Sequence, residues 1–513
     1  MRSVLMTKIQ KNSVYILLGF SVLFFITRVP RLWNDTINPD SVNWHYRTEQ
    51  FMNGIKYQQW EKTYQHYHPG VTLMWITGVS TEIFKHIYHI RQENVYNFQA
   101  IDFISKFSIV YVQLVLSLYI IFILRKYFGI WGSSILVSLF SFEPFFVGNS
   151  RLYHLDVLFA LFVFASLITG YLAIQRNSYY YYVATGILLS LSVLTKSIGM
   201  LAVIFYSIWF IVDAVRNKRL KRLYALLVVL VISGGLSFAL FPALWVRPIY
   251  YINFIISETF RVGIRVGHEQ LVFDTATKNA SYWFYFITLA LKSSPVLLLG
   301  VAIFAFYSYR LREKYKTQIN SGFILYLALF LVLYLLGISV VAKKVDRYIT
   351  LIYPILAVFS YYGYLAISQI KGVKIFLGVL LISFIVIPLI TLFPYYFTYT
   401  NPLFGSPVDA NRIIGQKPFG IGVYDLKDFI LTKYRDTRGY PHLGFLDIKP
   451  MESIYPNSSV FDIRVDGVDN FDYIVLGINE TLPDRFATNN QFVLSSTMNI
   501  NRLEYWRIYA KQK

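Results

Sequence analysis

Residues 151–176 of this chain read RLYHLDVLFALFVFASLITGYLAIQR. The charged and polar residues at the start of the stretch end at Asp156, and an apolar run follows at once and continues almost to Arg176. A helix needs roughly 20 mostly apolar residues to cross the hydrocarbon core of a bilayer. The stretch therefore predicts a membrane span that begins at an acidic residue, and a charge at membrane depth usually has a partner or a function.

Other apolar runs of similar length predict further spans, about eleven in all. They begin near Asn12, Phe107, Ile130, Asn177, Ser197, Leu223, Trp283, Ser321, Tyr348 and Ile375, and the last ends near Tyr399. The composition agrees, because the chain is 56% hydrophobic and 15% charged, whereas a soluble chain carries about 25% charged residues. This excludes a disordered chain and an ordinary cytosolic enzyme, and the absence of Cys excludes disulfides and thiolate chemistry.

The net charge of +20 does not indicate a nucleic-acid partner, because the basic residues fall mostly in short gaps between the apolar runs. Short loops rich in Lys and Arg face the cytoplasm. Alternate loops carry such clusters, at Lys8 and Lys11, Arg125 and Lys126, 216–222, 310–316, and Lys371 and Lys374. We therefore expect a multi-pass protein of the plasma (inner) membrane with a cytoplasmic N terminus and an exoplasmic C terminus.

Three regions are too polar to cross the membrane and are expected outside: residues 28–102, residues 247–281 and the tail 400–513. Within the first, residues 71–90 predict a helix that lies at, or dips into, the outer face, because a crossing there would invert the later basic loops. The alternative is a true crossing that a further span compensates. The tail alternates short β-like runs with turn residues and predicts a small α/β domain. The fold class is thus a polytopic α-helical membrane protein with a small exoplasmic C-terminal α/β domain.

Charged residues also gather at the outer ends of the spans, where the orientation rule does not require them. They are Asp40, Glu143, Arg151, His154, Asp156, Lys196, Arg247, Arg261, Arg265, His268, Lys343, Lys344, Asp346 and Arg347. Acids and bases from distant segments thus meet at one face and can form a polar cleft at the membrane surface. Lys and Arg bind phosphate through charge-assisted hydrogen bonds, and a neighbouring carboxylate can act as a base. This pattern favours an anionic lipid headgroup as the ligand.

An ordered set of motifs resembles the GT-C membrane glycosyltransferases, in the branch of the protein O-mannosyltransferases and the lipid A aminoarabinose transferase (glycosyltransferase family 39 type). The motifs are Asn38-Pro39-Asp40, His68-Pro69-Gly70, Arg151-Leu-Tyr-His-Leu-Asp156, Leu194-Thr195-Lys196, Lys343-Lys344-Val-Asp346-Arg347-Tyr348 and Tyr395-Tyr396-Phe-Thr-Tyr399-Thr-Asn401-Pro402. The resemblance covers residues 1–399, which it implies to be the catalytic membrane domain.

The resemblance implies transfer of a monosaccharide from a polyprenyl-phosphate donor to an acceptor hydroxyl on the exoplasmic side, in one inverting step. Asp40 matches the family's first-loop aspartate and is the expected base, and Asp156 matches its second acid. The expected substrate-binding residues are His68, Lys196, Lys344, Arg347, Arg265 and His268. A glycolipid, a glycan and a protein all remain open as the acceptor. A divalent metal near the two aspartates is left open as well.

Several of the charged residues also have a purely structural interpretation. Asp40 can cap a helix, Asp156 can pair with Arg151, and Lys292 can pair with Glu143 within the membrane. The alternative function is a transporter or flippase of lipid-linked sugars. Transporters place their sites near the midplane between repeats, whereas here the charges gather at one face and no repeat is visible.

Overall fold

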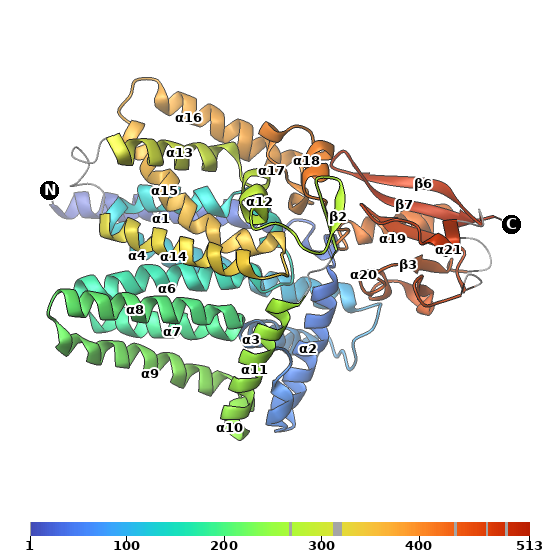
Figure 1. Ribbon diagram of the computed structural model, residues 1–513, viewed down its shortest axis with the longest axis horizontal. Helices are drawn as coiled ribbons and strands as arrows, with labels where there is room; N and C mark the ends of the chain where they lie inside the picture. Colours follow the sequence, from blue (N-terminus) through green and yellow to red (C-terminus); the bar gives the residue numbers. More distant parts are fainter. Residues whose placement is uncertain are drawn as a thin grey trace.

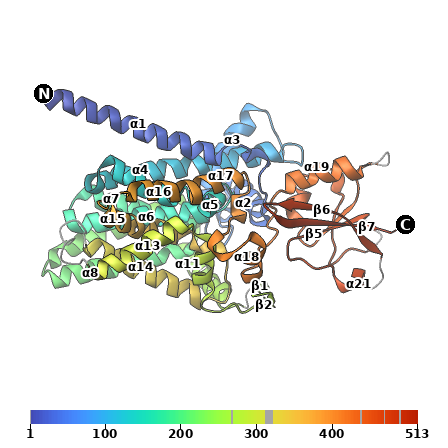
Figure 2. The same cartoon turned by 90° about the horizontal axis from the view of Figure 1, so that it is seen from above.

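The computed structural model describes residues 2–265, 269–310, 321–435, 439–467, 470–487 and 491–512. Long helices lie side by side in a bundle, and a small sheet projects from one end of it (Figure 1). The N terminus lies at the opposite end of the bundle from the sheet (Figures 1 and 2). The predicted fold class, a polytopic helical protein with a small C-terminal α/β part, is confirmed.

The bundle is built around helix α6, the stretch 151–176 apart from its polar start. Its helices are α1 (Arg2–Arg28), α4 (Phe98–Ser141), α6 (Asp156–Arg176), α7 (Tyr179–Thr195), α8 (Met200–Arg216), α9 (Leu223–Leu240), α12 (Phe284–Lys292), α13 (Pro295–Arg310), α14 (Ser321–Val340), α15 (Ile352–Ile367), α16 (Val373–Leu381) and α17 (Ile387–Thr391). All of the apolar window of α6 is buried, because α4, α7, α8, α14 and α15 pack around it.

The helices account for all of the predicted runs. Within the described residues, eight helices are long and apolar enough to cross a membrane, and a ninth span results if α12 and α13, which meet at a bend of 117°, are counted together. Helix α7 has 17 residues and holds another predicted run. Helix α4 holds two, because its backbone leaves helical geometry at Gly129, where φ is 66°. The predicted total of about eleven counted these shorter and broken segments as full spans.

Several helices gather at the end of the bundle nearest the sheet. They are α2 (Pro39–Lys56), α3 (Val71–Ile87), α5 (Pro144–Ser150), α10 (Ala243–Val246) and α11 (Pro248–Ile264). Helices α2 and α11 run across the direction of the bundle helices (Figure 1). Helix α3 packs on α2 and α4. The expected helix at residues 71–90 is therefore present at this end.

The C-terminal part is a mixed five-stranded sheet with the order β4-β3-β5-β7-β6. Strands β4, β3 and β5 are parallel, and β7 runs antiparallel to both β5 and β6. Its elements are α18 (Pro407–Ile413), α19 (Val423–Tyr434), β3 (Leu443–Phe445), α20 (Lys449–Glu452), β4 (Val460–Asp462), β5 (Tyr473–Gly477), α21 (Asp484–Ala487), β6 (Phe492–Ile500) and β7 (Leu503–Lys511).

The start of this C-terminal part is hydrogen-bonded to the loop 247–281, which the sequence predicts to lie outside. That loop forms the hairpin β1 (Gln270–Val272) and β2 (Thr275–Thr277). The Phe273 N–H donates to Ile413 O at 3.0 Å, and the Gly415 N–H donates to Leu271 O at 2.8 Å. The tail therefore continues a structure that the outer loop begins, and the predicted boundary at residue 400 stays a prediction.

Candidate active site

Asp40 stands at the N terminus of α2, where the local sequence both starts the helix and favours a negative charge. The Asn38 side chain caps the helix by accepting from the Ser41 N–H at 2.8 Å. Pro39 occupies the first helical turn, where its missing N–H costs nothing. An acidic side chain there is stabilised by the helix dipole. The structural interpretation of Asp40 as the cap is wrong, because Asn38 takes that place and leaves the Asp40 carboxylate available.

Asp156 begins α6 and lies between two partners from other segments. Its Oδ1 contacts Lys196 Nζ, and its Oδ2 lies 2.7 Å from His154 Nδ1. The side chains of both Asp156 and Lys196 are buried. The alternative pairing with Arg151 is wrong, because Arg151 Nε donates to Asp35 Oδ2 at 2.6 Å. Asp156 therefore offsets the charge of a buried lysine instead.

Arg347 joins the two aspartates. It lies in the 3-10 helix η5 (Asp346–Leu351), which leads into α15. Its Nη2 donates to Asp40 Oδ2 at 3.0 Å, and its Nε lies 3.8 Å from Asp156 Oδ2. His154 approaches both carboxylates as well, with its Nε2 3.4 Å from Asp40 Oδ2. Four segments far apart in the sequence thus meet in one charged cluster: Asp40, His154 with Asp156, Lys196, and Arg347.

The Asp40 carboxylate is ionised but still accessible. Desolvation raises its pKa, but the hydrogen bond from His154 and the charge of Arg347 outweigh that effect and hold the pKa below its ordinary value. At the same time 45% of the side chain is exposed. Asp40 is thus the acid of the cluster that an incoming ligand can reach, whereas Asp156 is enclosed.

His68 lies beside the turn that carries Lys196. Its Nδ1 is 3.2 Å from Ser197 Oγ, and the Gly70 N–H donates to Thr195 O at 3.3 Å. Burial and the neighbouring Lys196 hold the pKa of His68 well below its ordinary value. The ring is therefore uncharged at neutral pH, and it can offer a phosphate a hydrogen bond but no positive charge.

The two lysines before Arg347 differ in their surroundings. Lys344 is buried, and its Nζ donates to the carbonyl oxygens of Ser339 at 2.6 Å and Val341 at 2.9 Å. Its ammonium group therefore satisfies carbonyl oxygens at the C-terminal end of α14. Lys343 is partly exposed, and the negative charge of Asp40 acts on it. Lys343 is thus better placed than Lys344 to receive an external anion.

A cavity of about 290 Å³ opens on Asp40. Its charged lining consists of Asp40, Lys343, Lys344, Asp346, Arg347 and Lys417, and Phe419 lies in its wall. The Arg347 guanidinium lies 4.5 Å from the centre of the Phe419 ring. Lys417 and Phe419 come from the C-terminal part, so both parts of the chain build this cavity. We call it the Asp40 cavity.

A second, apolar cavity of about 540 Å³ adjoins the Asp40 cavity beside α12. The two share Phe284 and Ile414 in their walls. The remaining lining is almost wholly apolar and includes Trp283 and Phe286, which are themselves exposed at the surface of α12. An amphiphilic ligand with a charged head and an apolar tail would match this pair of cavities.

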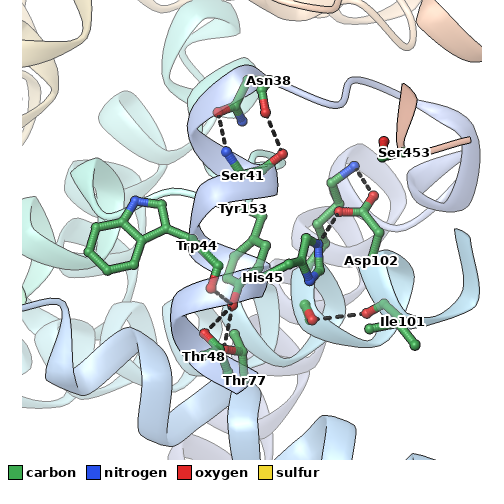
Figure 3. A network of polar contacts seen from close by, with 12 residues as sticks. Asn38, Ser41, Trp44, His45, Thr48, Thr77, Ile101, Asp102, Tyr153 and Ser453 are labelled. Atoms are coloured by element: carbon green, nitrogen blue, oxygen red, sulfur yellow. Dashed lines mark hydrogen bonds and ion pairs between the residues drawn. The ribbon is translucent and has the colours of Figure 1, made fainter. Parts of the chain in front are cut away.

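A buried polar network fixes the turns of α2 that follow its first turn (Figure 3). His45 Nε2 lies 3.0 Å from Asp102 Oδ1, and Lys106 Nζ lies 2.5 Å from Asp102 Oδ2. On the neighbouring turn, the Tyr153 hydroxyl lies 2.7 Å from Thr48 Oγ1. Buried polar groups cost free energy unless they are paired, so this network favours one orientation of α2.

The end of α11 lies beside the turn that carries Lys343, because the Ala342 N–H donates to Gly263 O at 3.1 Å. Arg265 is exposed at the C-terminal end of α11. His268 lies outside the described residues. Lys292 and Glu143 do not pair: Lys292 Nζ donates to Tyr399 O at 3.0 Å, and Glu143 accepts from the Ser294 N–H at 2.9 Å.

A metal does not fit the described residues well. Among them no group of three or more His, Asp or Glu side chains is arranged to hold a metal ion. Asp156 is occupied by Lys196, and Asp40 by Arg347. Both carboxylates are thus already paired with side-chain cations, whereas a divalent ion would need them as free ligands.

The comparisons with known proteins agree with this fold. A family model described as dolichyl-phosphate-mannose-protein mannosyltransferase matches residues 68–241. The structure is similar to ArnT from Cupriavidus metallidurans bound to undecaprenyl phosphate, with 13% identity, 97% of each chain covered and a TM-score of 0.50. The apo state of that ArnT matches with 13% identity, 98% coverage of each chain and a TM-score of 0.51.

The oligosaccharyltransferase from Archaeoglobus fulgidus, in complex with Zn and sulfate, matches with 14% identity over 90% of this chain and 68% of that one, at a TM-score of 0.45. Comparison with curated proteins finds no match. The resemblance to GT-C membrane glycosyltransferases that the motifs indicate is confirmed, and the fold is that of ArnT.

Proposed function

We propose that this chain transfers a monosaccharide from a polyprenyl-phosphate donor to an acceptor hydroxyl on the exoplasmic side, with inversion. The observation that carries the proposal is the Asp40 cavity, where an accessible carboxylate and the cations Lys343 and Arg347 lie next to an apolar cavity. The comparisons support it, because ArnT has been solved with undecaprenyl phosphate.

The donor phosphate binds Arg347 and Lys343 in this proposal, and the isoprenoid chain enters the apolar cavity beside α12. Charge-assisted hydrogen bonds to phosphate are the strong ones. The acceptor oxygen attacks the anomeric carbon while the bond from that carbon to the phosphate oxygen breaks. The phosphate takes the electron pair of the broken bond, and the cations stabilise its new charge.

Asp40 accepts the proton of the attacking hydroxyl. In the free protein Arg347 and His154 keep the pKa of Asp40 low, which makes it a weak base. A bound phosphate shares Arg347, so the carboxylate loses part of its counter-charge and becomes more basic. Donor binding therefore activates the base, and Asp156 keeps Lys196 and His154 in place around it.

The position of the site supports the exoplasmic orientation. The site lies at the end of the bundle that carries the sheet, and the basic loop 216–222 connects α8 and α9 at the other end (Figure 1). Basic loops face the cytoplasm. The transporter alternative is disfavoured, because the charged cluster lies at one end of the bundle instead of its middle.

Replacing Asp40 by Asn tests the role of the base. Asp40→Asn keeps the size of the side chain and removes the proton acceptor, so transfer should fall at least about 10²-fold. Mass analysis of envelope glycolipids and glycoproteins, with and without the gene, identifies the product to be measured. Asp428→Asn, an exposed position on α19, is the matched control. Near-normal transfer by a correctly inserted Asp40→Asn protein would remove Asp40 from the mechanism.

A further inference from the structure

The C-terminal sheet has a crevice where its strand order changes direction. β3 lies between β4 and β5, and all three strands are parallel. The chain leaves β3 toward β4 on one side, and it leaves β5 toward β6 at the opposite edge. In open α/β sheets, ligands bind outside the carboxyl ends of parallel strands at such a switch point.

A cavity of about 660 Å³ occupies this crevice. Leu446 and Asp447, which follow β3, and Asn479 and Glu480, which follow β5, form one wall. The β1–β2 hairpin of the outer loop closes the other side through residues such as Ala276. Sites for small ligands have volumes of about 300–1,000 Å³. We call this space the junction cavity, because both parts of the chain form it.

The junction cavity continues into the Asp40 cavity. The residues that line both are Pro39, Gln270, Gly415, Lys417 and Phe419. Pro39 directly precedes Asp40. A ligand in the junction cavity can therefore direct one of its groups at the Asp40 carboxylate. The apolar cavity beside α12 meets the Asp40 cavity at other residues, Phe284 and Ile414.

The lining of the junction cavity favours hydroxyl groups and disfavours anions. Three carboxylates line it, those of Glu269, Asp447 and Glu480. Of the two cations, Arg464 is already bound to Asp462, with its Nη2 2.6 Å from Asp462 Oδ2, which leaves Lys417. Carboxylates accept hydrogen bonds from hydroxyl and ammonium groups, whereas like charges placed together cost binding energy.

We propose that the junction cavity is the acceptor site and that the acceptor is a saccharide without negative charge, one hydroxyl of which reaches Asp40. This inference rests on the proposed function, because only a transferase needs an acceptor next to Asp40. It adds the acceptor class, and it assigns acceptor selection to loops after β3 and β5 of the C-terminal sheet.

An array of immobilised oligosaccharides tests the proposal with the full-length protein purified in detergent. The array carries neutral, amino-substituted, uronic and phosphorylated glycans, together with peptides that contain Ser and Thr. Wild-type protein should bind the neutral or amino-substituted glycans. Ala276→Trp fills the junction cavity from the hairpin and should weaken this binding at least tenfold. Lys278→Trp places the same bulk at an exposed position of the same segment, outside the cavity, and should bind like wild type.

Binding of undecaprenyl phosphate to the same proteins shows that each variant is folded and separates the two proposals. If undecaprenyl phosphate does not bind to the wild type, the proposed function fails. If it binds but the array shows only peptides or acidic glycans bound, or nothing bound, the saccharide proposal is overturned. Wild-type glycan binding by Ala276→Trp would also overturn it, because the ligand would then lie elsewhere.

Discussion

Two adjacent lysines illustrate how a single residue's surroundings decide its role. Lys343 and Lys344 belong to the same basic motif and both line the Asp40 cavity, yet Lys344 Nζ already donates to the carbonyl oxygens of Ser339 and Val341. A charge-assisted hydrogen bond is worth about 1.5–3 kcal/mol. Lys343→Ala should therefore weaken binding of undecaprenyl phosphate roughly ten- to a hundredfold, as measured with purified protein.

Lys344→Ala is the control variant for Lys343→Ala. It removes the donor from the end of α14, so its main effect should be a lower thermal unfolding midpoint, with lipid affinity little changed. The opposite pattern, in which Lys344→Ala loses the lipid and Lys343→Ala keeps it, would place the phosphate nearer α14 and reverse this assignment.

At the scale of the element, the start of α2 positions Asp40, the proposed base. The Asn38 side chain caps the helix, and the His45–Asp102–Lys106 network holds the turns behind it. Loss of an N-cap costs about 0.5–2 kcal/mol. Asn38→Ala should lower stability by about 1 kcal/mol and also reduce transfer severalfold, because Asp40 is two residues further along.

A second capped helix provides the matched control for this prediction. Ser406 caps α18 by accepting from the Asp409 N–H, and that helix carries none of the proposed catalytic residues. Ser406→Ala should lower stability by a similar amount without a matching loss of transfer. Equal effects of the two variants on transfer, at equal stability, would show that the start of α2 does not position the base.

For the whole molecule, the structure makes the C-terminal part a wall of the site rather than a separable attachment. Lys417 and Phe419 line the Asp40 cavity, and Arg31 Nη2 lies 2.8 Å from Asp425 Oδ1. Figure 2 shows the C-terminal part directly against the end of the bundle. A chain truncated after Asn401 should therefore lose binding of undecaprenyl phosphate as well as transfer.

A milder change separates this prediction from simple misfolding. Phe419→Ala keeps the whole chain and removes only the ring that lies against Arg347. Like the truncation, it should weaken the binding of undecaprenyl phosphate. If the correctly inserted truncated protein binds the lipid as tightly as the full chain, the C-terminal part acts on the acceptor alone.

The sequence by itself determined the class of the protein and the end of the molecule that carries the site. Runs such as Val157-Leu-Phe-Ala-Leu-Phe can only be buried in lipid or in a helical core, and the charges Asp40, Asp156, Lys196 and Arg347 all fall at predicted outer ends. These are local properties, because each apolar run and each charge at its end can be recognised without knowing what packs against it.

Only the tertiary structure decided which of these charges meet. Asp156 contacts Lys196 instead of Arg151, and the ammonium group of Lys344 donates to backbone carbonyl oxygens although Lys344 and Lys343 both line the Asp40 cavity. The same holds for His154, which the sequence placed only among the outer charged residues and which lies between the two aspartates, and for Phe419 beside Arg347, which the sequence did not assign to the site. Pairing between distant segments depends on helix orientation and on desolvation within the packed bundle, and no local pattern in the chain encodes either.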